Sequence, residues 1–211
     1  MALKKRREHG KESWVFFLDL VKVFDRVPRE LLWKVLEQFG VPAKLISILK
    51  ALHNNFEVKF TVDDNTHIVS CTIGVKQGDI LGPILFTFFL AAVMITWRAT
   101  TNTPLCVFRT KNDAKMTGRS YRAYGDEFSL NDSEYANDTA LIFDSRTDCE
   151  TGIPLCINHF ARFGMEVHSG PIEPKETSKS VILFCSKPPS MYDDPITFDN
   201  ANLSDITFRD R

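Results

Sequence analysis

The chain has 211 residues, of which 44% are hydrophobic and 25% charged, and its formal net charge is -1. This length allows one domain or slightly more, with enough residues for a proper core. The near-neutral charge counts mildly against a strong stand-alone nucleic-acid binder, because such proteins are usually basic. The composition is that of an ordinary globular domain.

The five cysteines indicate a reducing, intracellular compartment. They form no CxxC pair, and none lies near a histidine at the spacing of a zinc site. We find no signal-like segment and expect an intracellular protein, in the nucleus or the cytoplasm. The cysteines are Cys71, Cys106, Cys149, Cys156 and Cys185.

The first 12 residues are polar and basic, with a run of cations from Lys4 to Arg7. Such a run is most often a solvated arm, and a nuclear-import or phosphate-binding patch is the alternative. Residues 14–18 are all apolar and predict a short buried strand that ends at Asp19.

Two helices and a hairpin are predicted next. Proline and glycine set the limits of a helix over residues 28–39, and Pro42 opens a second helix that ends at about His53. Residues 57–62 and 67–75 flank Asp63-Asp64-Asn65, which is typical of a β-hairpin.

Residues 80–97 are almost wholly apolar, which is close to the lower limit for a membrane span. Gly82 and Pro83 near the start, with Asp79 as an N-cap, fit a buried helix equally well. Taken alone, this segment leaves both interpretations open.

The second half alternates polar and apolar segments. Residues 99–132 are polar and weakly periodic, so we interpret them as an insertion in a domain of residues 13–186. Residues 1–12 form the basic arm, and residues 187–211 form an acidic, loosely held tail. Without βαβ regularity, the pattern predicts an α+β sheet with helices on one face. The predicted strands are 105–109, 121–124, 139–143 and 181–185, and the predicted helix is about 153–163, closed by Gly164.

Two aspartates stand at strand ends, Asp19 after the first apolar strand and Asp138 before a later one. A carboxylate there is costly unless it is paired or binds a metal. If the two strands pair, a divalent cation between the carboxylates would relieve their repulsion, and oxygen ligands alone favour Mg²⁺ or Mn²⁺. This is the skeleton of a two-metal phosphoryl-transfer site. The alternative is that Asp19 caps a turn and Asp138 is a hairpin residue.

Five short motifs occur along the chain, and their order is informative as well as their residues. The first three resemble the F-x-D-L-x-K-A-F-D-x-V motif, the G-V-x-Q-G-x-x-L-S-P-x-L-F motif and the Y-A-D-D box of reverse transcriptases. The last two resemble that family's following G-L/M and S-K-T motifs. The motifs are FLDLVKVFDRV at 17–27, GVKQGDILGPILF at 74–86, YAND at 135–138, FGM at 163–165 and SKS at 178–180.

The resemblance spans about residues 13–186 and is closest to non-LTR, LINE-like retrotransposon and group II intron enzymes. It implies a polymerase palm-like antiparallel sheet with helices on one face, and fingers and thumb largely missing. It also makes residues 80–97 the buried helix behind the second motif, so we expect no membrane span.

The resemblance further implies a metal site for Mg²⁺, with Mn²⁺ as a substitute. Asp19, the Leu20 carbonyl and Asp138 would ligate the metals. Lys179 would neutralise or protonate the pyrophosphate leaving group, although a lysine there fits a solvated surface charge equally well.

It also implies a nucleotide site for deoxynucleoside triphosphates, used with an RNA template and a DNA primer. Phe24 would lie under the incoming sugar and exclude a 2′-hydroxyl, and its alternative is a core aromatic. Gln77 and Gly78 would shape the floor beneath nucleotide and template, and their alternative is an ordinary turn.

The chain departs from the family at Asn137, which replaces the first aspartate of the Y-x-D-D box. Asparagine keeps the shape but loses a negative charge and the bridging oxygens, so we expect weak metal binding and little or no polymerisation. We expect an impaired or inactive reverse transcriptase fragment. The alternatives are a non-catalytic nucleic-acid- or protein-binding remnant of the palm, supported by residues 4–7, and a chain without a selected function.

Overall fold

The structure is a computed structural model. The chain divides into two compact units, of which the first comprises Met1–Asp19, Asn102–Leu155 and His168–Arg211, and the second Leu20–Thr101 and Cys156–Val167. The structure describes residues 3, 6, 11–54, 57–76, 78–100, 107–111, 124–130, 132–135, 138–169, 178–185 and 207–210.

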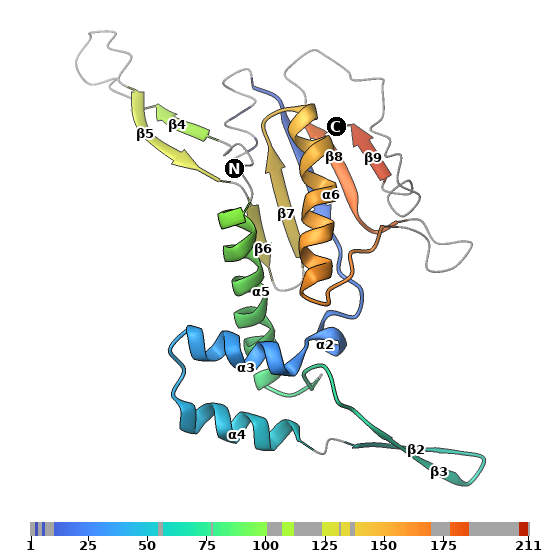
Figure 1. The fold of residues 1–211 in the computed structure, drawn as a ribbon. Helices are drawn as coiled ribbons and strands as arrows, with labels where there is room; N and C mark the ends of the chain where they lie inside the picture. The colour runs from blue at the N-terminus through green and yellow to red at the C-terminus, as the bar shows by residue number, and fades with distance from the viewer. Residues whose placement is uncertain are drawn as a thin grey trace. The chain divides into compact units, whose positions relative to one another are not determined.

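The first unit contains a sheet of five strands in the order β6-β7-β1-β8-β9 (Figure 1). Neighbouring strands are antiparallel, except that β9 runs parallel to β8. This sheet confirms the predicted α+β class with a largely antiparallel palm-like sheet. The strands are β1 (Ser13–Leu18), β6 (Asp132–Tyr135), β7 (Asp138–Phe143), β8 (Val181–Cys185) and β9 (Thr207–Asp210).

One face of this sheet is open near the end of β1, although Val15 and Ile142 further along the same face are buried. Phe17 is 44% exposed, and its cross-strand partners Ala140 and Val181 are partly exposed on the same face. On the other face, a Cβ added at Gly152 of α6 (Arg146–Arg162) would lie 2.4 Å from the Phe143 ring, so α6 covers that face. Its buried side chains are Trp14, Phe16, Leu18, Leu141, Phe143, Ile182 and Phe184.

Some elements of the first unit differ from the sequence predictions. Residues 207–210 form β9, whereas a loosely held tail was predicted there. Helix α6 begins seven residues earlier than predicted, because Ser145 caps its N-terminus. The Ser145 hydroxyl accepts the Asp148 N–H at 3.1 Å and donates to the Asp148 carboxylate at 2.6 Å. In the polar insertion, β4 (Val107–Lys111) pairs with β5 (Tyr124–Ser129), three residues later than the predicted second strand.

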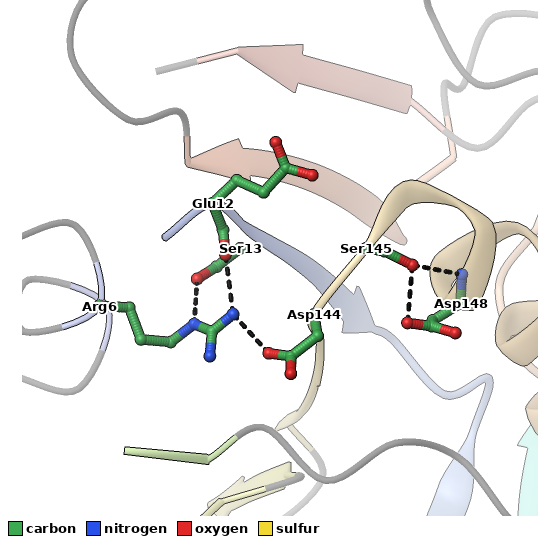
Figure 2. Close-up of polar contacts among 6 residues, drawn as sticks. All are labelled: Arg6, Glu12, Ser13, Asp144, Ser145 and Asp148. Atoms are coloured by element: carbon green, nitrogen blue, oxygen red, sulfur yellow. Dashed lines mark hydrogen bonds and ion pairs between the residues drawn. The ribbon is translucent and has the colours of Figure 1, made fainter. Parts of the chain in front are cut away.

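The burial of Arg6 contradicts the prediction of a solvated arm. Its side chain is 2% exposed and donates to the Ser13 hydroxyl at 2.7 Å and the Glu12 carbonyl at 2.8 Å (Figure 2). It also forms an ion pair with Asp144, which follows β7. The other three cations of the run lie outside the described residues. The non-catalytic binding alternative therefore loses one of the four cations that supported it.

Replacing Arg6 by leucine is expected to lower the free energy of unfolding by about 1–3 kcal/mol, because Ser13 and Asp144 lose a buried donor. The loss stays in this range because Asp144 is 33% exposed and water can solvate it. Arg146→Leu is the matched control, since it removes a partly exposed i,i+4 pair with Glu150 worth about 0.3–0.5 kcal/mol. Urea unfolding measures both variants, and equal losses would contradict the buried role of Arg6.

The second unit contains helices α2 to α5, the end of α6 from Cys156 onward, and a hairpin (Figure 1). Pro28 and Pro42 occupy the N-cap positions of α3 and α4, as their places in the sequence suggested. Asp63 and Asp64 form the hairpin turn with φ of 50° and 62°, as a two-residue turn with left-handed backbone requires. The elements are α2 (Val23–Arg26), α3 (Arg29–Gln38), α4 (Ala43–His53), α5 (Leu81–Thr100), β2 (Glu57–Val62) and β3 (Asn65–Ser70).

Strand β3 ends at Ser70, five residues earlier than predicted, because Arg29 binds the chain that follows. Its guanidinium donates to the carbonyls of Cys71 at 2.8 Å, Ile73 at 3.2 Å and Gly74 at 2.7 Å, and to that of His53 at 2.8 Å. Burial lowers the pKa of Arg29, and the Cys71 thiol raises it to a smaller extent. These carbonyls therefore bond to one side chain instead of a neighbouring strand.

Among the described residues, α5 is the one helix long and apolar enough to cross a membrane by length and composition. One of its faces is buried, with Phe86 5.0 Å from the Phe24 ring, while Ile84 and Ile95 are about half exposed. We expect α5 to be a core helix. After cell lysis, the protein should then stay in the supernatant of a high-speed spin, and carbonate-resistant membrane sedimentation would contradict this. The buried residues of α5 are Leu85, Phe86, Phe89, Leu90, Val93, Met94 and Trp97.

Candidate active site

Asp19 and Asp138 lie at the same end of two paired strands. The last registered pair of β1 and β7 is Leu18 with Thr139, so the next position sets Asp19 against Asp138. Opposed residues of an antiparallel pair have Cα atoms about 4.5–5.5 Å apart. Asp19 lies two residues after Phe17, and Asp138 two before Ala140, so alternation assigns both to the open face. Asp19 is partly exposed and Asp138 is exposed, as ligands for a hydrated cation need to be.

The backbone of Asp19 is fixed by two residues from the end of the unit. Its N–H donates to the hydroxyl of Ser180 at 3.2 Å, and its carbonyl accepts the N–H of His168 at 2.8 Å. Both partners are buried. These two hydrogen bonds therefore hold the backbone of Asp19 at the point where β1 ends and the next loop begins.

Lys179 lies in a turn anchored by its two neighbours. Ser178 is 5% and Ser180 0% exposed, while Lys179 is exposed. The Ser178 hydroxyl is 3.0 Å from the His168 carbonyl and 3.1 Å from the Ser180 carbonyl, and donates to these acceptors. The Lys179 N–H donates to His168 Nδ1 at 3.3 Å. The structure thus brings Lys179 within one residue of a group that bonds to Asp19.

Sequence reasoning missed the roles of His168, Ser178 and Ser180. The SKS motif drew attention to its lysine, whereas the structure gives both serines a buried hydroxyl with a backbone partner. The SKS motif itself was the available signal. It places a serine on each side of the lysine, and serine hydroxyls readily bond to backbone groups and can so anchor a turn.

Two predicted site residues, Asn137 and Gln77, lie outside the described residues. Tyr135, the first residue of the YAND segment, pairs with Asp138 in the β6–β7 ladder. Asp138 therefore begins the ladder of β7 with β6, and the ladder of β7 with β1 begins one residue later, at Thr139. That rigid backbone is suited to presenting a metal ligand.

Leu20, whose carbonyl was predicted as a metal ligand, and the predicted nucleotide residues Phe24 and Gly78 belong to the second unit. Leu20 is buried and forms a β-bridge with Val167. Phe24 is only partly buried, with its ring 5.0 Å from that of Phe86, so it has a core contact and an accessible part. Gly78 is exposed with φ of 83°, a conformation that favours glycine.

Gly74 brings the first and second motifs together within this unit. Its N–H donates to the Val27 carbonyl at 2.9 Å, and the next N–H, of Val75, donates to the Phe24 carbonyl at 2.8 Å. With φ of 82°, a Cβ at Gly74 would lie 2.8 Å from the Phe24 oxygen and from two backbone atoms of Asp25. Only glycine permits this close approach, so the second motif depends on Gly74 for its place beside Phe24.

Two carboxylates, those of Asp19 and Asp138, stand at this end of the sheet, and the residue before Asp138 is an asparagine, Asn137, which carries an amide. The described part of the chain contains no group of three or more His, Cys, Asp or Glu side chains able to hold a metal. Thiol chemistry is also unfavourable at Cys149, because burial and the charges of Glu150 and Asp148 raise the pKa of its thiol.

A family model described as reverse transcriptase (RNA-dependent DNA polymerase) matches residues 2–170, most of the chain. No curated protein matches the chain at the level of significance required. The matched residues include the motifs at 17–27, 74–86, 135–138 and 163–165 and end before Ser178. The assignment of Lys179 therefore rests on the resemblance of its motif and on its hydrogen-bonded link to Asp19.

Proposed function

The chain belongs to the reverse transcriptase family, and on that basis we propose that it is a palm domain of the non-LTR retrotransposon type with impaired nucleotidyl transfer. The observation that carries the proposal is the pairing of Leu18 with Thr139, because Asp19 follows the first of these residues and Asp138 precedes the second. Reverse transcriptases in general use an RNA template and deoxynucleoside triphosphates, and we propose the same substrates here.

In this proposal Asp19 and Asp138 hold Mg²⁺, and the Leu20 carbonyl adds a neutral ligand. The bound cation would activate the primer 3′-hydroxyl and offset charge on the phosphates. Two divalent ions about 4 Å apart repel by roughly 16 kcal/mol at an effective dielectric constant of 20. A carboxylate lost at Asn137 removes a charge that would offset this repulsion, so the second metal is the one that the site loses.

Lys179 would act on the leaving group of the reaction, the pyrophosphate. Its exposed ammonium group, on a turn bonded to the Asp19 backbone, can neutralise the pyrophosphate as it leaves. Its interaction with the developing charge is strongest in the transition state, and so it would act mainly on kcat.

The nucleotide contacts remain proposals drawn from the family resemblance. Phe24 would lie under the sugar and favour deoxynucleotides, and its partial exposure leaves part of the ring accessible for that contact. Gln77 and Gly78 would line the floor beneath the base and template. The positive φ of Gly78 is consistent with a backbone that a bound group approaches closely.

A Mn²⁺ titration followed by electron paramagnetic resonance tests the metal site in the protein as it stands. We expect weak binding that drops at least tenfold in Asp19→Asn and Asp138→Asn, because each loses a charged ligand. Asn137→Asp should tighten binding by about tenfold or more. Asp63→Asn, at the exposed β2–β3 turn of the other unit, is the control and should change nothing. Equal affinity in all four variants would refute the site.

A further inference from the structure

His168 lies outside every motif, and it forms hydrogen bonds to both Asp19 and the Ser178–Ser180 turn. It is 3% exposed, and its N–H donates to the Asp19 carbonyl at 2.8 Å. Its own carbonyl accepts the Ser178 hydroxyl at 3.0 Å, and its Nδ1 accepts the Lys179 N–H at 3.3 Å. One residue thus contacts both the strand end that carries Asp19 and the turn that carries Lys179.

The ring bond has a defined direction. The Lys179 backbone group can only donate, so Nδ1 is the acceptor and the proton of the neutral imidazole lies on Nε2. Nε2 is buried, and no hydrogen-bond partner for it occurs among the described residues. A buried donor without a partner costs free energy, so an apolar side chain would suit a purely structural position better. The contribution of this imidazole lies in the bond made by Nδ1.

We propose that His168 is a positioning residue, which holds the Ser178–Ser180 turn so that Lys179 faces the leaving group of the metal site. This proposal rests on the proposed function, because it assigns Lys179 to pyrophosphate. The backbone bonds of His168 fix the distance between the turn and Asp19, and Nδ1 fixes the orientation of the turn itself. Without the Nδ1 acceptor, the turn would lose the bond that fixes the direction of Lys179.

Two substitutions separate the Nδ1 bond from the presence of a polar group. In His168→Asn, the side-chain oxygen can occupy the place of Nδ1 and keep the bond to Lys179. In His168→Gln, the amide reaches the place of Nε2 and leaves Nδ1 unreplaced. Both variants are polar and compact, so a difference between them cannot come from polarity alone.

His53 supplies the matched control from the other unit. It is 1% exposed, its Nδ1 lies 2.9 Å from the Leu49 carbonyl, and its Nε2 has no partner among the described residues. His53→Gln therefore disturbs a buried histidine whose Nδ1 also has a backbone partner, although here Nδ1 donates to a carbonyl, at a place remote in sequence from the SKS motif. A merely structural role for His168 predicts that the two glutamine variants behave alike.

The experiment combines amide hydrogen exchange of Lys179, by NMR, with calorimetric binding of inorganic pyrophosphate in Mg²⁺. We expect His168→Gln to lose about tenfold in both exchange protection and pyrophosphate affinity, as one hydrogen bond implies. His168→Asn and His53→Gln should stay within about threefold of the parent chain. Unchanged exchange or unchanged pyrophosphate binding in His168→Gln would overturn the positioning role, as would equal losses in both glutamine variants.

A further variant, Lys179→Ala, distinguishes this proposal from the proposed function. If Lys179→Ala weakens pyrophosphate binding while His168→Gln does not, the positioning role fails and the function stands. If Lys179→Ala leaves pyrophosphate binding unchanged, and Asp19→Asn and Asp138→Asn leave Mn²⁺ affinity unchanged, the proposed function fails. The role of His168 then fails with it.

Discussion

Replacing Asn137 by aspartate is expected to raise primer extension on an RNA template by orders of magnitude, in a chimera supplied with the fingers and thumb of a related enzyme. Aspartate restores the charge and the bridging oxygens that two divalent cations need. Each ~1.4 kcal/mol of recovered transition-state stabilisation is tenfold in rate, so a few kcal/mol account for the gain. Deoxynucleotide incorporation in Mg²⁺ and then in Mn²⁺ measures it, since Mn²⁺ accepts imperfect ligand sets more readily.

Two controls belong to this experiment. Asp19→Ala added to the repaired chimera should abolish the gain, because the metals then lack their other bridging carboxylate. Asn65→Asp adds the same charge at the β2–β3 turn and should leave activity unchanged. Equal activity with asparagine and aspartate at position 137 would show that the bridging ligand is misassigned. Inactivity of both would place further damage elsewhere in the chain.

The second large effect is expected at Gly74. An alanine there should cost more than about 3 kcal/mol of unfolding free energy, because its Cβ meets three backbone atoms at 2.8 Å and backbone cannot rotate away. Relief would require breaking the bonds from Gly74 to Val27 and from Val75 to Phe24. We expect a large fall in the melting temperature or the loss of a cooperative transition, measured by circular dichroism.

Gly40 is the matched control for Gly74. Its φ of 80° is nearly the same, but an added Cβ would meet nothing within 4 Å. Gly40→Ala should therefore cost only about 1 kcal/mol, the penalty of a left-handed backbone, or about 2–4 °C in a chain of this size. Similar losses at both glycines would mean that backbone conformation dominates and that the close approach to Phe24 and Asp25 is unimportant.

The centre of the sheet could be predicted from sequence because its strands are short apolar runs. Strands β1, β7 and β8 follow from local patterns near residues 14–18, 139–143 and 181–185. The edge strand β9 could not be predicted in this way, because Thr207–Asp210 carries no apolar run and is defined by its pairing with β8. The burial of Arg6 was also hidden, since its partner Asp144 lies more than a hundred residues along the chain.

The start of α6 shows a different limit. Its first residues, with Gly152 and Pro154 inside the helix, give no apolar period, so the pattern became visible only from Ile153. The cap formed by Ser145 and Asp148 fixes the true start. Caps of this kind are readable in sequence only as a weak Ser-x-x-Asp signal.

For the candidate site, the motifs identified the charged residues but not their supports. Asp19, Asp138 and Lys179 were predicted because the chemistry expected of them depends on their side chains. Ser180 and His168 contact Asp19 through its backbone, which imposes no recognisable residue pattern. Arg29 is similar, because any chain segment offers carbonyls for its guanidinium.

The most direct test of the central claim is a crystal of the protein grown with Mn²⁺ and measured at the manganese absorption edge. Our account predicts an anomalous peak within about 2.5 Å of carboxylate oxygens from both Asp19 and Asp138. It also predicts a single strong peak in the parent chain and a second peak about 3.5–4 Å away in Asn137→Asp. Carboxyl groups of Asp19 and Asp138 more than about 8 Å apart, or manganese bound elsewhere, would contradict it.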